Sequence, residues 1–335
     1  MSNSNKKLKD TDFLYISTRL RSMENRLLSR ERMERMLEAR TDEDAAKVLA
    51  ECGYKGLDKP GADALAQSLS AARNETFAEL ATMSPNADMI DVFRIKYDYH
   101  NLKALIKCAR SGKNPDTMLI DAGRYPIETV RRAVLQGETS PLSDDARRAL
   151  ENASSILSAT GDPQKSDFAL DKACYGEMLS AAERSGSSFL LGYVRLQIDG
   201  ANLKAAVRSI RMKKDTEFIK NALLPGGNVS LESILGVCMG GGSLSSVFTG
   251  GMAEAAALGD TAKKGGRQTD FEKAVDNALN AYLQGSRLVS FGDSVLVAYM
   301  AAKENEITAA RIIMSGRMAG VPADSIRERL RDSYV

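Results

Sequence analysis

Residues 93–113 have the sequence FRIKYDYHNLKALIKCARSGK, and two related stretches follow further along the same chain. The second, YVRLQIDGANLKAAVRSIRMKK, spans residues 193–214, and the third, VLVAYMAAKENEITAARIIMSGR, spans residues 295–317. Each stretch has apolar residues at steps of three and four, which is the period of an amphipathic α-helix. The chain is therefore predicted to contain three copies of one helix.

Asn101, Asn202 and Glu306 occupy the same position in the three copies, which are therefore 101 and 104 residues apart. Solenoid repeats have shorter periods, about 20 to 50 residues. A chain of 335 residues is also too long for one hydrophobic core, since single cores stop growing near about 250 to 300 residues. The spacing predicts three similar units of about 100 residues.

The first copy carries a basic stripe, because four cations are spaced so that they fall on one helix face. These are Lys96, Lys103, Lys107 and Arg110, which correspond to Gln197, Lys204, Arg208 and Arg211 in the second copy and to Ala301, Thr308, Ile312 and Ser315 in the third. The apolar positions of the helix are mostly kept in all three copies. Two interpretations stay open: the stripes are solvated helix faces, or they face a partner with an acidic surface.

The rest of the chain also has helical periodicity, and no long alternation of β-branched residues occurs, so the sequence predicts an all-α fold. Ser29 and Thr41 stand where helix N-caps are expected, and Pro126 and Pro322 stand at helix starts. We expect helices joined by short turns throughout.

Two segments indicate boundaries. Residues 137–143 form a predicted loop, and residues 225–269 hold 11 of the 26 glycines and form a flexible connector or a loosely packed helical lobe. We therefore expect units at residues 1–140, 141–265 and 266–335, with the N-terminal helix of the first unit pairing toward the third.

Composition excludes several function classes. A formal net charge of +2 argues against nucleic-acid binding, which needs a concentrated positive excess. The four cysteines lack metal-ligand spacing and are expected to be reduced thiols of a cytoplasmic protein. No secretion signal is recognisable, and no apolar run reaches the length of a membrane span, so any membrane association is expected to be peripheral.

A catalytic constellation is hard to build, because His100 is the only histidine and lies within the repeated helix. We expect it to pack or to form a hydrogen bond. The glycine run at residues 236–251 lacks the lysine of a phosphate-binding loop, and Lys263 and Lys264 follow it in the wrong order. A nucleotide-binding enzyme that uses residues 236–267 is kept only as an alternative. No catalytic residue, cofactor or metal is predicted.

Three motifs in the right order resemble the C subunit of bacterial and archaeal V/A-type ATPases, which is related to the eukaryotic d subunit. They are DFLYISTRLRSMENRLLS at residues 12–29, YDYHNLKALIK at residues 97–107, and YMAAKENEITAARIIMSGRMAGVPADSIRERLRDSYV at residues 299–335. The resemblance extends over nearly the whole chain and is weakest at residues 225–269.

The resemblance implies a funnel-shaped protein of three helical domains about a pseudo-threefold axis. Such a protein is a non-catalytic socket in the cytoplasm, which couples the central shaft of the soluble ATPase head to the membrane rotor ring. A helical-repeat scaffold for another cytoplasmic partner stays as an alternative. The transported ion, a proton or sodium, is left open.

The family motif maps onto residues that we expect to have a structural or partner-contact role. They are Tyr97, Asp98, Asn101, Lys103 and Lys107 in the first copy, Asp199, Asn202, Lys204 and Arg208 in the second, and Glu306 and Arg311 in the third. The third copy departs from the pattern, with Lys303 in place of the aspartate and Thr308 in place of the lysine.

Overall fold

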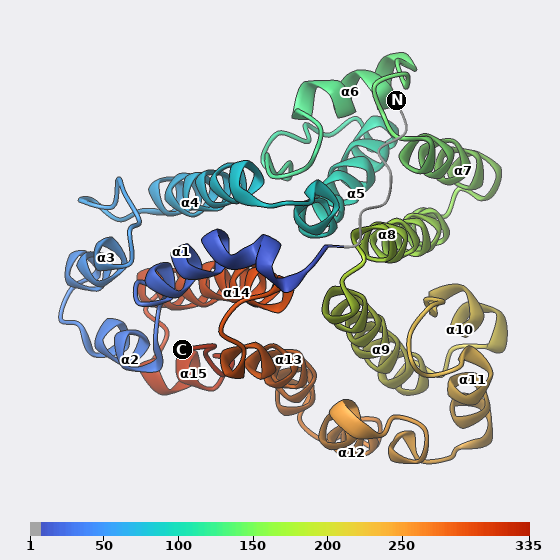
Figure 1. The fold of residues 1–335 in the computed structure, drawn as a ribbon. Coiled ribbons are helices and arrows are strands. Elements are labelled where there is room, and N and C mark those ends of the chain that lie inside the picture. The colour runs from blue at the N-terminus through green and yellow to red at the C-terminus, as the bar shows by residue number, and fades with distance from the viewer. Residues whose placement is uncertain (1–7) are drawn as a thin grey trace. The chain divides into compact units, whose positions relative to one another are not determined.

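The computed structural model describes residues 8–335, and within this range the chain forms helices and no strands (Figure 1). The α-helices are α1 (Leu14–Glu24), α2 (Arg30–Glu38), α3 (Asp42–Glu51), α4 (Ala62–Met83), α5 (Ala87–Ser111), α6 (Ile127–Gln136), α7 (Asp144–Thr160), α8 (Pro163–Ser185), α9 (Ser188–Arg211), α10 (Thr216–Ala222), α11 (Leu231–Gly240), α12 (Ala253–Ala262), α13 (Gln268–Gln284), α14 (Asp293–Met318) and α15 (Ala323–Arg327). Four short 3₁₀ helices are η1 (Asp10–Phe13), η2 (Leu244–Ser246), η3 (Gly250–Met252) and η4 (Gly285–Leu288). The all-α prediction is confirmed.

Helix starts follow the local sequence. The Ser29 and Thr41 side chains accept hydrogen bonds from backbone N–H groups in the first turns of α2 and α3, as predicted. Pro126 and Pro322 are the N-cap residues of α6 and α15. The predicted loop before α7 ends at Ser143, whose hydroxyl caps that helix.

The described residues divide into two compact units. Unit 1 comprises residues 8–90, 186–193 and 272–335. In it α1 and α4 lie alongside α14 (Figure 1). Apolar residues of α2, α3 and α4 share a core with Ile307, Ile313 and Met314 of α14. The N-terminal helices thus pack on the third copy of the repeated helix, which is buried around much of its circumference.

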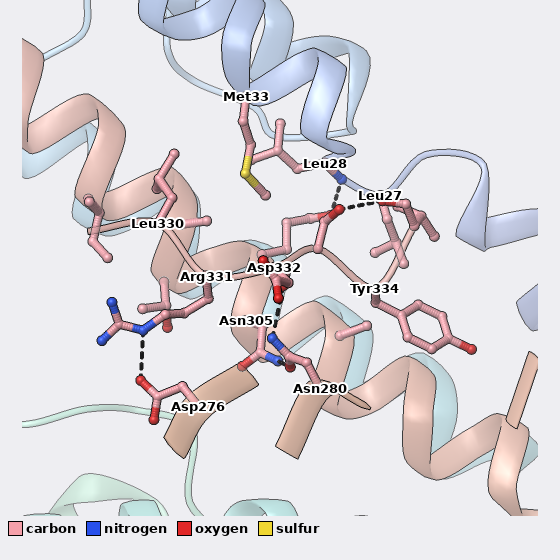
Figure 2. A pocket seen from close by; sticks show the side chains of 17 residues that line it. Leu27, Leu28, Met33, Asp276, Asn280, Asn305, Leu330, Arg331, Asp332 and Tyr334 are labelled. Atoms are coloured by element: carbon pink, nitrogen blue, oxygen red, sulfur yellow. Dashed lines mark hydrogen bonds and ion pairs between the residues drawn. The ribbon is translucent and has the colours of Figure 1, made fainter. Parts of the chain in front are cut away.

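The C-terminal residues 330–335 help to line a pocket in unit 1 (Figure 2). Leu330 is fully buried and Tyr334 is nearly so. The Arg331 guanidinium pairs with Asp276 at 2.8 Å, and the Asn280 amide donates to the Asp332 carbonyl at 2.8 Å. These contacts fasten the chain end to α13.

Unit 2 comprises residues 91–185 and 194–271. The glycine-rich segment within it is largely helical, and its Phe248 and Leu244 are fully buried. A Cβ on Gly259 would lie 3.1 Å from the Phe271 ring, so glycine allows close packing there. Of the two alternatives for residues 225–269, the structure has the helical lobe, and its core is packed rather than loose.

The division at residues 1–140, 141–265 and 266–335 stays a prediction. The two compact units are defined by contacts between segments, and they do not test a division based on sequence repeats. No helix within residues 8–335 is both long enough and apolar enough to cross a membrane.

Candidate functional site

The three repeated stretches are long helices, α5 with 25 residues, α9 with 24 and α14 with 26. In the first, the buried Asn101 side chain binds both backbone groups of one residue: its Nδ2 donates to the Ile120 carbonyl at 2.8 Å, and its Oδ1 accepts from the Ile120 N–H at 2.9 Å. Asn202 binds Leu224 in the same way, at 2.8 and 2.7 Å. A side-chain amide can pair with a peptide group on both edges. Each asparagine therefore fixes the loop that follows its helix.

An aspartate one turn earlier binds the same loop. Asp98 accepts from the backbone N–H of Arg124 at 2.9 Å and from that of Tyr125 at 3.3 Å. Asp199 accepts from the Val229 N–H at 3.2 Å and from the Asn228 side chain at 2.7 Å. We call these two sets the first clamp (Asp98 and Asn101 with residues 120–125) and the second clamp (Asp199 and Asn202 with residues 224–229).

Glycine makes room for both carboxylates. A Cβ built on Gly123 would lie 2.1 Å from Asp98 Oδ1, and one on Gly227 would lie 2.3 Å from Asp199 Oδ1. No side chain fits at such distances without a shift of the loop or of the helix. The match between the two copies therefore extends from the helix to the loop.

Buried charge surrounds the first clamp. Burial raises the pKa of Asp98 to about 6, although the neighbouring Arg124 guanidinium partly offsets this effect. Arg124 Nε donates to Asp98 at 2.7 Å, and its Nη1 donates to Glu177 of α8 at 2.8 Å. Burial would lower the pKa of Arg124, but hydrogen bonds and charge from Glu177 and Asp98 raise it. Tyr99 also donates to Glu177, at 2.9 Å. The cluster ties α5, the loop and α8 together.

The third copy reaches the same result with other residues. Glu306 is 4% exposed and accepts from the backbone N–H of Leu28 at 2.7 Å and from the Tyr54 hydroxyl at 2.6 Å. Lys303, which replaces the aspartate, donates to Glu306 at 2.6 Å. Burial raises the pKa of Tyr54 well above its usual value, so the hydroxyl stays a donor. In this third clamp the bound backbone comes from the N-terminal segment, directly before the Ser29 cap.

The basic stripe of the first copy pairs within its own unit. Lys103 forms an ion pair with Asp171, and Lys107 lies 2.6 Å from Asp167, both on α8. Arg110 donates to the Leu157 carbonyl at 3.1 Å. Helix α8 of the same chain therefore supplies acidic partners for the first stripe. The sequence alone had indicated only solvent or a partner protein.

The remaining candidates lie apart from the clamps. Tyr97 is buried beneath Lys96, whose Nζ is 4.9 Å from the ring centroid. Lys204 is half-buried, whereas Arg208 and Arg311 are exposed. Of the predicted site residues, only the two aspartates, the two asparagines and Glu306 therefore take part in the three clamps.

His100 and Lys263, which were weighed as candidates for chemistry, both form contacts within the chain. His100 Nε2 lies 2.8 Å from the Met118 carbonyl, which fits the hydrogen-bonding role expected for it. Lys263 donates to the Gly242 carbonyl at 2.5 Å and pairs with Asp260 at 2.8 Å, so it holds the glycine-rich segment together. Residues 8–335 contain no cluster of potential metal ligands.

Sequence reasoning missed Gly123, Gly227, Arg124 and Glu177. A second internal match could have revealed the loop: LIDAGRYPIE at residues 119–128 corresponds to LLPGGNVSLE at residues 223–232. Both stretches hold the clamped residue, the glycine and the start of the next helix. Glu177 has no such signal, because its role depends on how α8 packs.

Known proteins resemble this chain along nearly its whole length. Residues 16–329 match the model of the family described as ATP synthase (C/AC39) subunit. The C subunit of the V-type sodium ATPase of Enterococcus hirae is 23% identical, over 94% of this chain and 97% of the relative. The C subunit of the V-type ATP synthase of Deinococcus radiodurans is 26% identical, over 96% and 91%. The C subunit of the A-type ATP synthase of Thermococcus onnurineus is 23% identical, over 97% and 92%.

Proposed function

The chain belongs to the ATP synthase (C/AC39) subunit family, and on that premise we propose that it is the central-stalk adaptor of a rotary V/A-type ATPase. It is an accessory subunit of that complex and not the catalytic one. In the proposed role it is a socket: the central shaft of the soluble head inserts on one side, and the membrane rotor ring binds on the other. Torque passes through this socket and couples ATP synthesis or hydrolysis in the head to proton or sodium ion transport in the membrane.

The observation that supports this proposal most strongly is the extent of the match. The family model spans residues 16–329, and each of the three relatives is covered over more than nine-tenths of its length. The whole chain, and not one shared module, therefore resembles a rotary ATPase subunit.

The clamps supply a mechanical reason. An adaptor that transmits torque must not deform, and its loops are the parts most easily deformed. Asn101, Asn202 and Glu306 each fasten a connecting segment to a long helix through buried hydrogen bonds. Such bonds are costly to break without a replacement partner. Three similar units about a pseudo-threefold axis, each stiffened in this way, would form the socket.

Membrane association in this proposal is peripheral, on the cytoplasmic face and through the ring, which agrees with the lack of a spanning helix within residues 8–335. No cofactor is required, because the adaptor catalyses no reaction.

Co-purification tests the proposal. The tagged full-length chain should retain the shaft subunits and the detergent-solubilised rotor ring of its own complex when both are present. It should also retain each of these two partners when the other is absent. Retention of neither partner at low salt would refute the adaptor role and would favour a scaffold for another protein.

A further inference from the structure

The loops of the two asparagine clamps differ at one position. Arg124 follows the close glycine of the first loop, and Asn228 follows that of the second. Both side chains bind the same oxygen of the clamp aspartate: Arg124 Nε donates to Asp98 Oδ2 at 2.7 Å, and Asn228 Nδ2 donates to Asp199 Oδ2 at 2.7 Å. The second copy therefore has this hydrogen bond without the cation that makes it in the first.

Asp199 is a buried carboxylate that is 2% exposed. Burial raises its pKa, and the groups that counteract this effect within residues 8–335 are the neutral amides of Asn228 and Val229. At Asp98 the Arg124 guanidinium counteracts the same effect. A carboxylate accepts about four hydrogen bonds, and the amides around Asp199 supply up to three. Asp199 can therefore accept a further donor, and a cationic donor would balance its charge.

A cavity of about 480 Å³ lies beside Asp199 in unit 2. Its walls come from α9, from the second clamp loop with the start of α11, and from the segment between α11 and α12. Among the described residues that line this cavity, Asp199 is the only charged one. Small-molecule sites in proteins have volumes of about 300 to 1,000 Å³. The cavity is therefore large enough for a small molecule next to the carboxylate.

The opposite wall adds hydrogen-bond acceptors and a little apolar surface. The Ser246 hydroxyl donates to the Ser243 carbonyl at 2.6 Å, so its oxygen keeps its lone pairs for an incoming donor. Thr249 supplies a second hydroxyl, and Val247 and Met252 supply the apolar surface. A cation with several N–H donors and a short alkyl chain matches this lining.

We propose that this cavity, which we call the Asp199 cavity, binds a small molecule through its guanidinium group, with the Asp199 carboxylate as the counter-ion. A guanidinium is planar and presents its N–H donors in a rigid fork, so it can pair with a carboxylate and donate to a second acceptor at once. The first copy contains such an arrangement, because Arg124 donates to Asp98 at 2.7 Å and to Glu177 at 2.8 Å through different nitrogens.

The start of α11 lies in the same wall, and a helix N-terminus by itself favours an anion. The Ser230 hydroxyl oxygen accepts from the Ser233 N–H at 3.2 Å and so satisfies part of this terminus. The first copy has a helix start at the same place, since α6 begins at Ile127, three residues after Arg124. A guanidinium is therefore compatible with this helix start, whereas the Asp199 carboxylate would repel an anion.

A ligand-observed NMR titration of the full-length chain at pH 8 tests the inference with three probes. Butylguanidinium carries the proposed group, butylurea has the same planar shape without the charge, and butylammonium has the charge without the planar fork. Butylguanidinium should bind with a Kd of about 1 mM or lower, and each of the other two should bind at least about tenfold more weakly. Equal binding of butylurea or of butylammonium, or no binding of butylguanidinium, would overturn the proposal.

Two variants locate the binding. Asp199→Asn should weaken butylguanidinium binding at least about tenfold, because a charge-assisted hydrogen bond is lost. Glu151→Gln, at an exposed position of α7 in the same unit, is the charge-matched control and should bind as the wild type does. Asn228→Arg gives the second loop the residue found at Arg124, so the chain's own guanidinium should occupy the cavity.

Asn228→Arg should keep the circular dichroism spectrum of the wild type, since Asn228 is exposed, and it should not bind the probe. This variant tests the site even if Asp199→Asn does not fold. Probe binding that persists in either variant would contradict the proposed site.

The inference goes beyond the adaptor role and does not depend on it. A chain that retains shaft and ring but does not bind butylguanidinium would lose only the Asp199 cavity. A chain that binds the probe but retains neither shaft nor ring would lose only the adaptor role.

Discussion

Asn202→Asp should make the stability of unit 2 dependent on pH. Asn202 is fully buried, its Nδ2 lies 2.8 Å from the Leu224 carbonyl oxygen, and its Oδ1 lies 2.7 Å from the Leu224 nitrogen. A protonated carboxyl has the same shape as the amide and can also donate to the carbonyl. An ionised carboxylate cannot donate, and it would place a negative oxygen against the carbonyl oxygen. The protonated form therefore preserves the clamp and the ionised form breaks it.

The size of the effect follows from burial. Full burial raises carboxyl pKa values by up to about 3 to 5 units, and each unit corresponds to about 1.4 kcal/mol. A rise of about 3 units gives a loss of about 4 kcal/mol as the pH increases from about 4 to 7. The sign is that of a raised carboxyl pKa: the folded state holds its proton more tightly than the unfolded state, so the free energy of unfolding falls as the pH rises.

Urea unfolding followed by circular dichroism at pH 4, 5, 6, 7 and 8 measures this loss. At pH 4 the variant should approach the wild type, at pH 5 it should be less stable by about 1.5 kcal/mol, and at pH 8 by about 4 kcal/mol. Asn152→Asp, at an exposed position of α7 in the same unit, is the control and should follow the wild type. If Asn202→Asp equals the wild type at pH 8, the clamp does not stabilise the loop and the reasoning fails.

Three further variants test the other clamp residues. Gly227→Ala should lower the free energy of unfolding by about 3 kcal/mol, because its new methyl would lie 2.3 Å from a carboxylate oxygen. The control Gly236→Ala, in open space within α11, should be neutral or slightly stabilising. Equal urea midpoints for the two variants would contradict the close approach at Gly227. Glu306→Gln should lower the free energy of unfolding by about 3 to 5 kcal/mol, because it leaves the buried Lys303 without its counter-ion. The control Glu79→Gln, in an exposed ion pair, should lower it by less than about 1 kcal/mol. Thermal unfolding that ranks the two variants the other way would exclude the third clamp. The stability of the wild type relative to Asp98→Asn should fall by about 3 kcal/mol as the pH rises from about 4 to 6, since the pKa of Asp98 is raised from 3.8 to about 6; a flat difference would show that this carboxyl titrates normally.

The helices could be predicted because their signals are local. Ser29 and Thr41 cap the expected helices, and the repeated stretches have the period of α5, α9 and α14. Asn101 and Asn202 were singled out because they recur, although recurrence does not say what they bind.

The partners of those residues could not be predicted from local pattern. Ile120 lies 19 residues after Asn101, and Leu224 lies 22 residues after Asn202, so no fixed spacing connects a helix to its loop. Leu28, which binds Glu306, lies 278 residues before it. Contacts of this range depend on how helices pack, and packing is a property of the whole unit.

The basic stripe shows the same limit. A helical wheel correctly places Lys103 and Lys107 on one face, but it does not show what the face meets. Asp171 and Asp167 are themselves four residues apart on α8, so two helices with complementary spacing pair along their lengths. That complementarity appears only once α8 is known to lie beside α5.

The central claim is that this chain couples the shaft to the ring, and a reconstitution tests it most directly. Membrane vesicles that contain the rotor ring and its stator are combined with the soluble head and shaft, with and without the chain, and ATP hydrolysis and ion uptake are measured together. The account predicts that the head hydrolyses ATP in both cases and that ions accumulate only when the chain is present. Equal ion uptake without the chain would contradict it.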